Sequence, residues 1–221
     1  MSQLLTDPAF IQRLESLWLL ARKVLSGTLQ SDRKSIRKGS GITFADYSEY
    51  SLGDDYRSID WRVYARMETL MIKLFEMEED VTIYFLLDSS RSMKKKFLLA
   101  RQLAAALGYI GLNMLDRIII YGLADELNSV MPRSQGRGKI LTMLQTLEAA
   151  ALFGSDTDFT TCCRQLRARH PKRGVVIVLS DFFYPGGYSE GLQFLQWCKH
   201  DVFCIQTLDP TDLTCSSRGD I

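Results

Sequence analysis

The chain has 221 residues, of which 46% are apolar, and its 27 Lys and Arg against 26 Asp and Glu leave a formal net charge of +1. A chain of this length and apolar content can bury a sizeable core, which excludes an intrinsically disordered protein. The balanced charge argues against a protein that binds nucleic acid by neutralising phosphates alone, and no apolar stretch approaches the roughly 18 residues of a membrane span. Five cysteines without a CxxC pair, and a start without the pattern of a signal peptide, predict a cytoplasmic protein with reduced thiols.

An amphipathic helix is predicted near the start of the chain. Pro8 follows Asp7, as is typical of the first turn of a helix, and apolar residues then recur at helical spacing up to Gly27. These apolar residues are Ile11, Leu14, Trp18, Ala21 and Leu25. The polar residues 28–41 that follow predict a loop.

From residue 81 onward, apolar runs alternate with helical patterns. Val81–Leu87 and Gly174–Leu179 are continuous apolar runs, as strands buried in a parallel sheet are. Further strands are predicted at Thr69–Phe75, Arg117–Leu123, Glu126–Met131 and Val202–Thr207, and helices at Lys94–Leu115, Gly138–Leu152, Asp158–Arg169 and Tyr188–His200. This alternation predicts an α/β fold with a doubly wound, mainly parallel sheet. We expect a main domain at residues 81–221, on which a small N-terminal region, residues 1–80, packs.

Two of the predicted buried strands are followed by an aspartate. Asp88 follows the apolar run VTIYFLL, and Asp181 follows GVVIVLS. Ligands of open α/β sheets lie beyond the carboxyl ends of the strands, where the strand order reverses. If the two strands are neighbours at that point, their carboxylates lie within several ångströms and repel each other unless a cation or proton neutralises them.

Hydroxyl side chains accompany these aspartates. Ser90 and Ser92 belong to a D-x-S-x-S pattern, and because alternate residues of an extended turn point the same way, we expect their hydroxyls to converge with the first aspartate. A further hydroxyl is expected from Thr157 in a later loop, with Thr160 and Thr161 as nearby alternatives. Oxygen ligands of this kind suit Mg²⁺, so the sequence predicts a Mg²⁺ (or Mn²⁺) site at this edge of the sheet.

The same residues resemble a known metal site. The D-x-S-x-S segment, the later threonine and the aspartate after a later strand are similar to the metal-ion-dependent adhesion site of von Willebrand factor A domains. The resemblance implies that Ser90, Ser92 and Thr157 bind the metal directly, while Asp88 and Asp181 bind it through water. It also implies that a carboxylate from a partner protein fills the open coordination position.

A longer motif precedes this pattern. The segment Gly53–Trp61 (GDDYRSIDW), followed by Ala65 and Arg66, resembles the signature Y-x-x-G-D-D-x-R-x-I-D-W-x-x-x-A-R of the domain-of-unknown-function 58 family, although Ser48 stands where an arginine is expected. The resemblance implies a bacterial adaptor or co-chaperone-like protein, often encoded beside a MoxR-type AAA+ ATPase. From the residues alone, we expect the aspartates to bond loop amides or pair with nearby arginines, and Trp61 to fill a core.

Together these patterns predict a non-enzymatic, metal-dependent protein-binding module, and the resemblance implies a MoxR-type AAA+ ATPase as its partner. The alternative is a Mg²⁺-dependent phosphoryl-transfer or hydrolytic enzyme that uses Asp88 and Asp181. A purely structural subunit with an empty site is a third interpretation. No catalytic residue is predicted, because neither His170 nor His200 has an obvious nucleophile partner, and Gly136–Ile140 lacks key residues of a phosphate-binding loop.

Overall fold

The computed structural model describes residues 5–28, 34–38, 43–78, 82–154 and 157–213. The chain divides into two compact units, of which the larger comprises Met1–Leu19 and Val81–Ile221 and the smaller comprises Leu20–Asp80. The first part of the N-terminal helix therefore belongs to the larger unit. That residues 20–80 pack on the main domain stays a prediction.

The larger unit is built on a central sheet. Within the described residues this sheet has five strands in the order β6-β5-β4-β7-β8. Their bounds are β4 (Thr82–Asp88), β5 (Arg117–Leu123), β6 (Leu127–Gln135), β7 (Val175–Ser180) and β8 (Asp201–Gln206). β6 is antiparallel to β5, whereas the β5–β4, β4–β7 and β7–β8 pairs are parallel. The predicted fold class, an α/β fold with a doubly wound, mainly parallel sheet, is confirmed.

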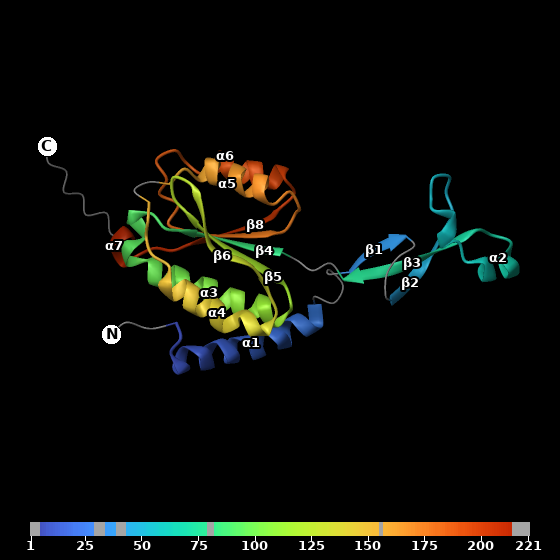
Figure 1. Ribbon diagram of the computed structural model, residues 1–221, viewed down its shortest axis with the longest axis horizontal. Helices are drawn as coiled ribbons and strands as arrows, with labels where there is room; N and C mark the ends of the chain where they lie inside the picture. The colour runs from blue at the N-terminus through green and yellow to red at the C-terminus, as the bar shows by residue number, and fades with distance from the viewer. Residues whose placement is uncertain (1–4, 29–33, 39–42, 79–81, 155–156, 214–221) are drawn as a thin grey trace. The chain divides into compact units, whose positions relative to one another are not determined.

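Helices cover both faces of this sheet (Figure 1). One face carries α3 (Phe97–Asn113), α4 (Ile140–Ala149) and the first part of α1 (Pro8–Thr28), and the other carries α5 (Phe159–Arg169) and α6 (Ser189–Trp197). Because successive side chains of a strand point to opposite faces, Phe85 and Leu87 of β4 enter one core and Tyr84 and Leu86 the other. Leu14 of α1 is 2% exposed within the first core, which confirms the amphipathic helix.

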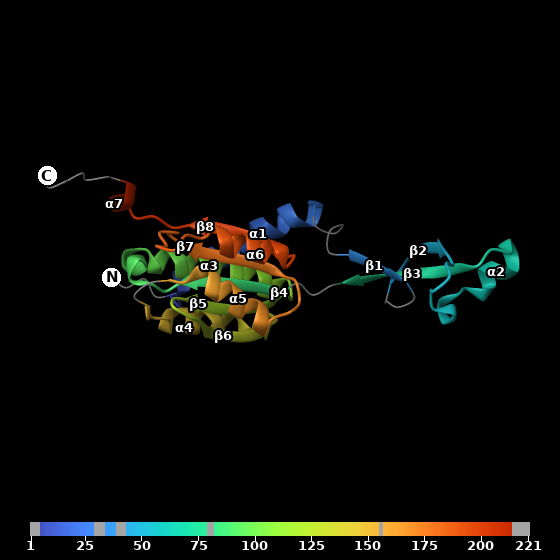
Figure 2. The same cartoon turned by 90° about the horizontal axis from the view of Figure 1, so that it is seen from above.

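Short helical segments complete this unit: η2 (Arg91–Lys95), η3 (Arg137–Lys139) and α7 (Pro210–Leu213). Figures 1 and 2 both show α7 at one end of this unit, and an ion pair between Lys96 and Asp212 joins it to the residue that follows η2. Of the helices that the structure describes, none combines the length and apolar composition needed to cross a membrane.

The smaller unit contains an antiparallel sheet of three described strands in the order β1-β3-β2. These are β1 (Lys34–Lys38), β2 (Thr43–Glu49) and β3 (Met71–Glu78), with η1 (Tyr56–Ser58) and α2 (Trp61–Met67) between β2 and β3. The predicted loop at 28–41 is wrong over β1, where backbone pairing with β3 forms a strand despite the polar sequence. Residues 29–33 and 39–41 of that predicted loop lie outside the described residues.

The GDDYRSIDW segment caps the short helices of this unit. The side chains of Asp54, Asp55 and Asp60 accept hydrogen bonds from the backbone N–H groups of Ser51, Arg57 and Arg62, respectively. The predicted bonds to loop amides are thus present. The prediction that Trp61 fills a core is wrong, since its side chain is 60% exposed. As the first residue of α2, directly after the capping aspartate, it contacts the Tyr64 ring edge-on at 6.2 Å between centroids.

Candidate functional site

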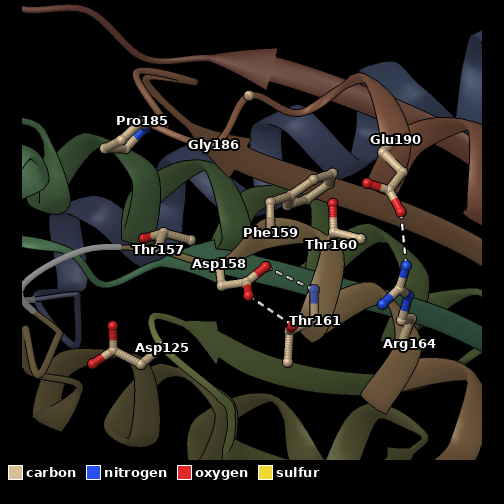
Figure 3. Close-up of a pocket in the computed structure, with 11 residues that line it drawn as sticks. Asp125, Thr157, Asp158, Phe159, Thr160, Thr161, Arg164, Pro185, Gly186 and Glu190 are labelled. Carbon is tan, nitrogen blue, oxygen red and sulfur yellow. Dashed lines mark hydrogen bonds and ion pairs between the residues drawn. The ribbon is translucent and has the colours of Figure 1, made fainter.

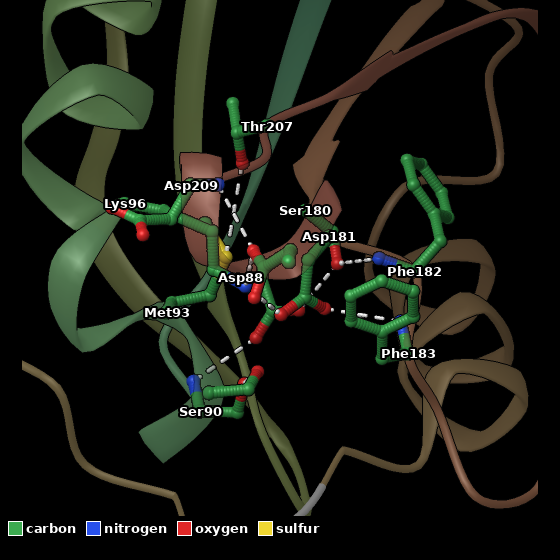
Figure 4. Close-up of polar contacts among 12 residues, drawn as sticks. Asp88, Ser90, Met93, Lys96, Ser180, Asp181, Phe182, Phe183, Thr207 and Asp209 are labelled. Carbon is green, nitrogen blue, oxygen red and sulfur yellow. Dashed lines mark hydrogen bonds and ion pairs between the residues drawn. The ribbon is translucent and has the colours of Figure 1, made fainter. Parts of the chain in front are cut away.

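The two strand-end aspartates lie on neighbouring strands. β4 and β7 are parallel partners, with Leu87 opposite Leu179. β5 follows β4 in the chain and lies on one side of it, while β7 lies on the other, so the strand order reverses between β4 and β7. Asp88 ends β4 and is 0% exposed, and Asp181 directly follows β7 and is 1% exposed. Figure 4 shows both side chains at this edge of the sheet.

Asp88 is the centre of a hydrogen-bonded cluster. Its Oδ1 accepts a bond from the backbone N–H of Ser90 at 3.0 Å and from the hydroxyl of Thr157 at 3.4 Å, and its Oδ2 accepts one from the hydroxyl of Ser180. The Oγ atoms of Ser90 and Ser92 lie 3.0 Å apart. Four of the five predicted metal ligands are therefore joined in one cluster, and the fifth directly follows Ser180 in the chain.

Thr157 reaches the cluster because its loop is fixed to the ends of two strands. Before it, the N–H of Phe153 donates to the carbonyl oxygen of Ser89 at 3.1 Å. After it, the N–H of Asp158 donates to the carbonyl oxygen of Ala124 at 3.2 Å. These backbone bonds hold a loop far along the chain against the carboxyl ends of β4 and β5.

The structure also separates Thr157 from Thr161, one of its two alternatives. Asp158 is the N-terminal cap of α5, and its carboxylate accepts bonds from the backbone N–H of Thr161 at 2.9 Å and from the Thr161 hydroxyl at 2.7 Å. These bonds lower the pKa of Asp158 below its ordinary value. Thr161 is thus engaged in helix capping, and the threonine hydroxyl that contacts Asp88 is that of Thr157.

The backbone around Asp181 is strained. Phe182 has φ of 60°, a left-handed conformation that a bulky residue adopts at a cost of about 1–3 kcal/mol. Two hydrogen bonds hold it there: the N–H of Phe182 donates to Ser180 Oγ at 2.9 Å, and the N–H of Phe183 donates to Asp181 Oδ1 at 3.0 Å. The tight turn keeps the Asp181 carboxylate at the edge of the sheet.

A buried lysine, which the sequence interpretation missed, binds the other oxygen of Asp181. The Lys96 Nζ is 2.7 Å from Asp181 Oδ2 and 2.9 Å from Asp212 Oδ2, and its side chain is 4% exposed. Burial alone would lower the pKa of Lys96, but the hydrogen bonds to the two carboxylates outweigh it and the pKa is raised. In the sequence, Lys96 ends a basic run with Lys94 and Lys95, which gives no sign that it is buried.

Tyr184 adds a buried hydroxyl near the cluster. Its side chain is 9% exposed, its ring stacks on Phe159 with centroids 5.5 Å apart, and among the described residues no partner reaches its hydroxyl with good hydrogen-bond geometry. Burial, followed by the negative charge of Asp88, raises the pKa of Tyr184. The same hydroxyl lies close enough to Ser180 and Asp88 to interact with both, which places Tyr184 at the rim of the cluster. No sequence pattern indicated this residue.

A pocket of about 450 Å³ lies beside the cluster. Figure 3 shows Thr157 on its wall, so the pocket and the cluster share this residue. An ion pair between Arg164 and Glu190, at 2.7 Å, lies on the same wall. Both of its side chains are more than half exposed, so the pair contributes little to stability.

The donor set of the cluster fits a small, hard cation. In the part of the chain that the structure describes, no group of three or more His, Cys, Asp or Glu side chains could hold a metal ion. The candidate site is not a cluster of that kind, because three of its five predicted ligands are hydroxyls. Mg²⁺ and Mn²⁺ favour oxygen ligands. Asp181 is paired with the ammonium of Lys96, so a metal ion at this site would compete with that ammonium for the carboxylate.

One curated relative and two solved structures are similar to different lengths of the chain. Uncharacterized protein Mb1516 of Mycobacterium bovis is 28% identical over 226 residues, which cover 97% of this chain and 70% of that protein. The solved structure of the conserved hypothetical protein BatB from Bacteroides thetaiotaomicron is 18% identical with a TM-score of 0.47, covering 57% of this chain and 66% of that one. A von Willebrand factor type A structure from Catenulispora acidiphila is 10% identical with a TM-score of 0.43, covering 80% and 41%. The chain thus spans less than two thirds of either solved structure.

One protein family matches most of the chain. The family described as "Protein of unknown function DUF58" matches residues 46–221. This range includes the GDDYRSIDW signature, both aspartates and every hydroxyl of the cluster. The chain therefore belongs to the DUF58 family.

Proposed function

We propose that this chain is a protein-binding module that holds Mg²⁺ (or Mn²⁺) directly with Ser90, Ser92 and Thr157, and through water with Asp88 and Asp181. The bound ion serves to capture an Asp or Glu side chain of a partner protein. The observation that carries the proposal is the single hydrogen-bonded cluster in which four of these residues meet at the point where the strand order reverses.

The residues of the cluster suit this task because they leave much of a cation's charge uncompensated. A divalent ion, when bound, supplies an electrophilic centre for a carboxylate. The three direct ligands are neutral hydroxyls. The charge of Asp88 is shared among three hydrogen bonds, and that of Asp181 is paired with the ammonium of Lys96. Because Asp88 and Asp181 are buried, charges in the site interact more strongly than in water.

The pocket next to Thr157 gives a partner segment room beyond its metal-binding carboxylate. Residues that flank the captured Asp or Glu can enter this recess, whose wall includes Asp125 and the loop at 185–187. Contacts there would contribute to the choice of partner. The resemblance to the DUF58 signature makes a MoxR-type AAA+ ATPase the partner to test first.

The contacts support binding more than catalysis. Both oxygens of Asp88 accept bonds from protein groups and Asp181 is paired with Lys96, so neither carboxylate is presented as a free general base. Both histidines lie near the opposite edge of the sheet, where β7 and β8 begin: His170 bonds Tyr121 at 2.8 Å, and His200 lies beside Gly174. Phosphatase activity that disappears in Asp88→Ala would overturn this interpretation.

The metal is tested by thermal unfolding in Mg²⁺ and in EDTA. An ion present at about 100 times its dissociation constant stabilises the folded state by about 2.7 kcal/mol, so Mg²⁺ should raise the melting temperature of the wild type. Ser90→Ala should abolish the increase. Ser129→Ala is the matched control, since Ser129 is an exposed serine of β6, and it should retain the increase. Equal melting curves of the wild type in Mg²⁺ and EDTA would contradict the proposal.

The partner is tested by capture of a MoxR-type ATPase on immobilised protein. Wild type with Mg²⁺ should retain the ATPase, whereas EDTA or Asp88→Ala should release it. Equal capture under all four combinations of protein and buffer would exclude a metal bridge to this partner.

A further inference from the structure

Lys96 is enclosed by groups that fix the position of its charge. Its Nζ donates to Asp181 Oδ2 at 2.7 Å and to Asp212 Oδ2 at 2.9 Å, and it lies 5.4 Å from the centroid of the Phe183 ring. The side chain is 4% exposed, so the ammonium depends on these partners rather than on water. The lysine is therefore a fixed internal cation at the edge of the proposed metal site.

Asp212 brings the C-terminal helix α7 into the same arrangement. Its Oδ2 also accepts a hydrogen bond from the backbone N–H of Asp209 at 2.9 Å, which fixes the carboxylate at the start of α7. One ammonium is thus shared between a proposed metal ligand, Asp181, and a residue that is no part of the ligand set. Its attraction to Asp212 competes with its attraction to Asp181.

Charge arithmetic shows what this sharing does. The innermost charges are three carboxylates, Asp88, Asp181 and Asp212, and one ammonium, Lys96. Asp209 and the exposed Lys95 act on Asp212 from outside. Removal of the ammonium would leave more negative charge for a divalent ion, and removal of the Asp212 charge would leave less. Because interactions between charges a few ångströms apart are strong in a partly buried site, both changes alter metal affinity measurably.

We propose that Lys96 is a built-in counter-ion that limits the affinity of the site for Mg²⁺, and that Asp212 of α7 raises this affinity by drawing the ammonium away from Asp181. Without metal, the ammonium neutralises Asp181 and stabilises the folded site. Lys96 acts through Asp181 and is a positioning residue rather than a ligand. This inference rests on the proposed metal-binding function.

The test is titration of the purified full chain with Mg²⁺ alone, by isothermal titration calorimetry, together with thermal unfolding in EDTA. Lys96→Met should bind Mg²⁺ about tenfold more tightly or better than the wild type, yet melt at a lower temperature in EDTA. The matched control is Lys94→Met, which removes the same charge from an exposed side chain two residues earlier in the chain. It should change the affinity by less than about twofold, because exposed charges are screened.

Asp212→Asn provides a second variant that keeps the buried lysine. It should bind Mg²⁺ several-fold more weakly than the wild type, opposite in sign to Lys96→Met. If the lysine and aspartate had merely structural roles, both variants would weaken binding together, and that result would overturn the inference. Unchanged affinity in both variants would overturn it equally. A wild type that binds Mg²⁺ while Lys96→Met gains no affinity refutes this inference alone, whereas a wild type that binds no Mg²⁺ refutes the proposed function as well.

Discussion

Ser180→Ala tests the hydrogen bonds that organise the edge of the sheet between the two aspartates. Ser180 is 0% exposed, donates its hydroxyl hydrogen to Asp88 Oδ2, and accepts a bond from the N–H of Phe182 at 2.9 Å. Alanine removes both contacts. The Asp88 oxygen then loses a partner in a buried place, and the left-handed backbone of Phe182 loses a restraint.

The expected loss follows from these contacts. A hydrogen bond to a charged group contributes about 1.5–3 kcal/mol, and a buried group left unpaired costs a similar amount. The contribution of the bond and the cost of the unpaired oxygen are partly the same loss, so they are not added. We expect the free energy of unfolding to fall by about 2–3 kcal/mol, or the melting temperature by about 4–12 °C for a chain of this size.

Urea unfolding without metal, followed by circular dichroism, measures this loss. Ser129→Ala, on the exposed edge of β6, is the matched control and should stay within about 0.5 kcal/mol of the wild type. Equal free energies for Ser180→Ala and Ser129→Ala would refute the argument that the Ser180 bonds hold the site together.

Three further predictions concern other parts of the chain. The Lys73 ammonium, 2.9 Å from Asp60, lowers the pKa of that carboxyl from 3.8 to about 2, so the ion pair stabilises the folded state fully above pH 3.8 and no longer does so once the pH falls through 2. Lys73→Met should move the midpoint of the Asp60 titration, followed by NMR, toward 3.8, and an unchanged midpoint would contradict this. Gly174→Ala places a Cβ 2.4 Å from a backbone oxygen of β4 and should lower the free energy of unfolding in urea by about 1–3 kcal/mol. Gly186→Ala, whose Cβ meets open space, is the control, and equal losses in the two variants would be evidence against this packing. Iodoacetamide should label Cys204 of the folded protein first, because its side chain is exposed whereas the thiols of α5 are buried; burial raises the pKa of the Cys204 thiol as well as those of α5, so access decides the order. Mass spectrometry that finds α5 labelled first would be inconsistent with the fold.

The fold of the larger unit follows well from sequence where side-chain pattern and burial agree. β5 was predicted at Arg117–Leu123, as observed, because all but its first residue are buried and the run is almost entirely apolar. β6 runs to Gln135, well past the predicted end at Met131. It is an edge strand whose exposed polar residues and Pro132 resemble a loop, since proline is tolerated at a sheet edge.

The site was predictable in the parts that local patterns encode. Asp88 and Asp181 were indicated because each follows a buried strand, and Ser90 because it lies two residues after the first aspartate. Lys96 and Tyr184 could not be predicted, because their roles depend on contacts with residues distant in sequence. The lysine binds Asp181, 85 residues away, and the tyrosine lies close to Asp88 only through the fold.

The most direct test of the proposed metal site is a crystal structure of the protein grown with Mn²⁺, with an anomalous difference map at the manganese absorption edge. We expect one anomalous peak bounded by the hydroxyls of Ser90, Ser92 and Thr157, and no peak there in Ser90→Ala crystals. A map without a peak at this position in the wild type, at a Mn²⁺ concentration that occupies other sites, would contradict the account.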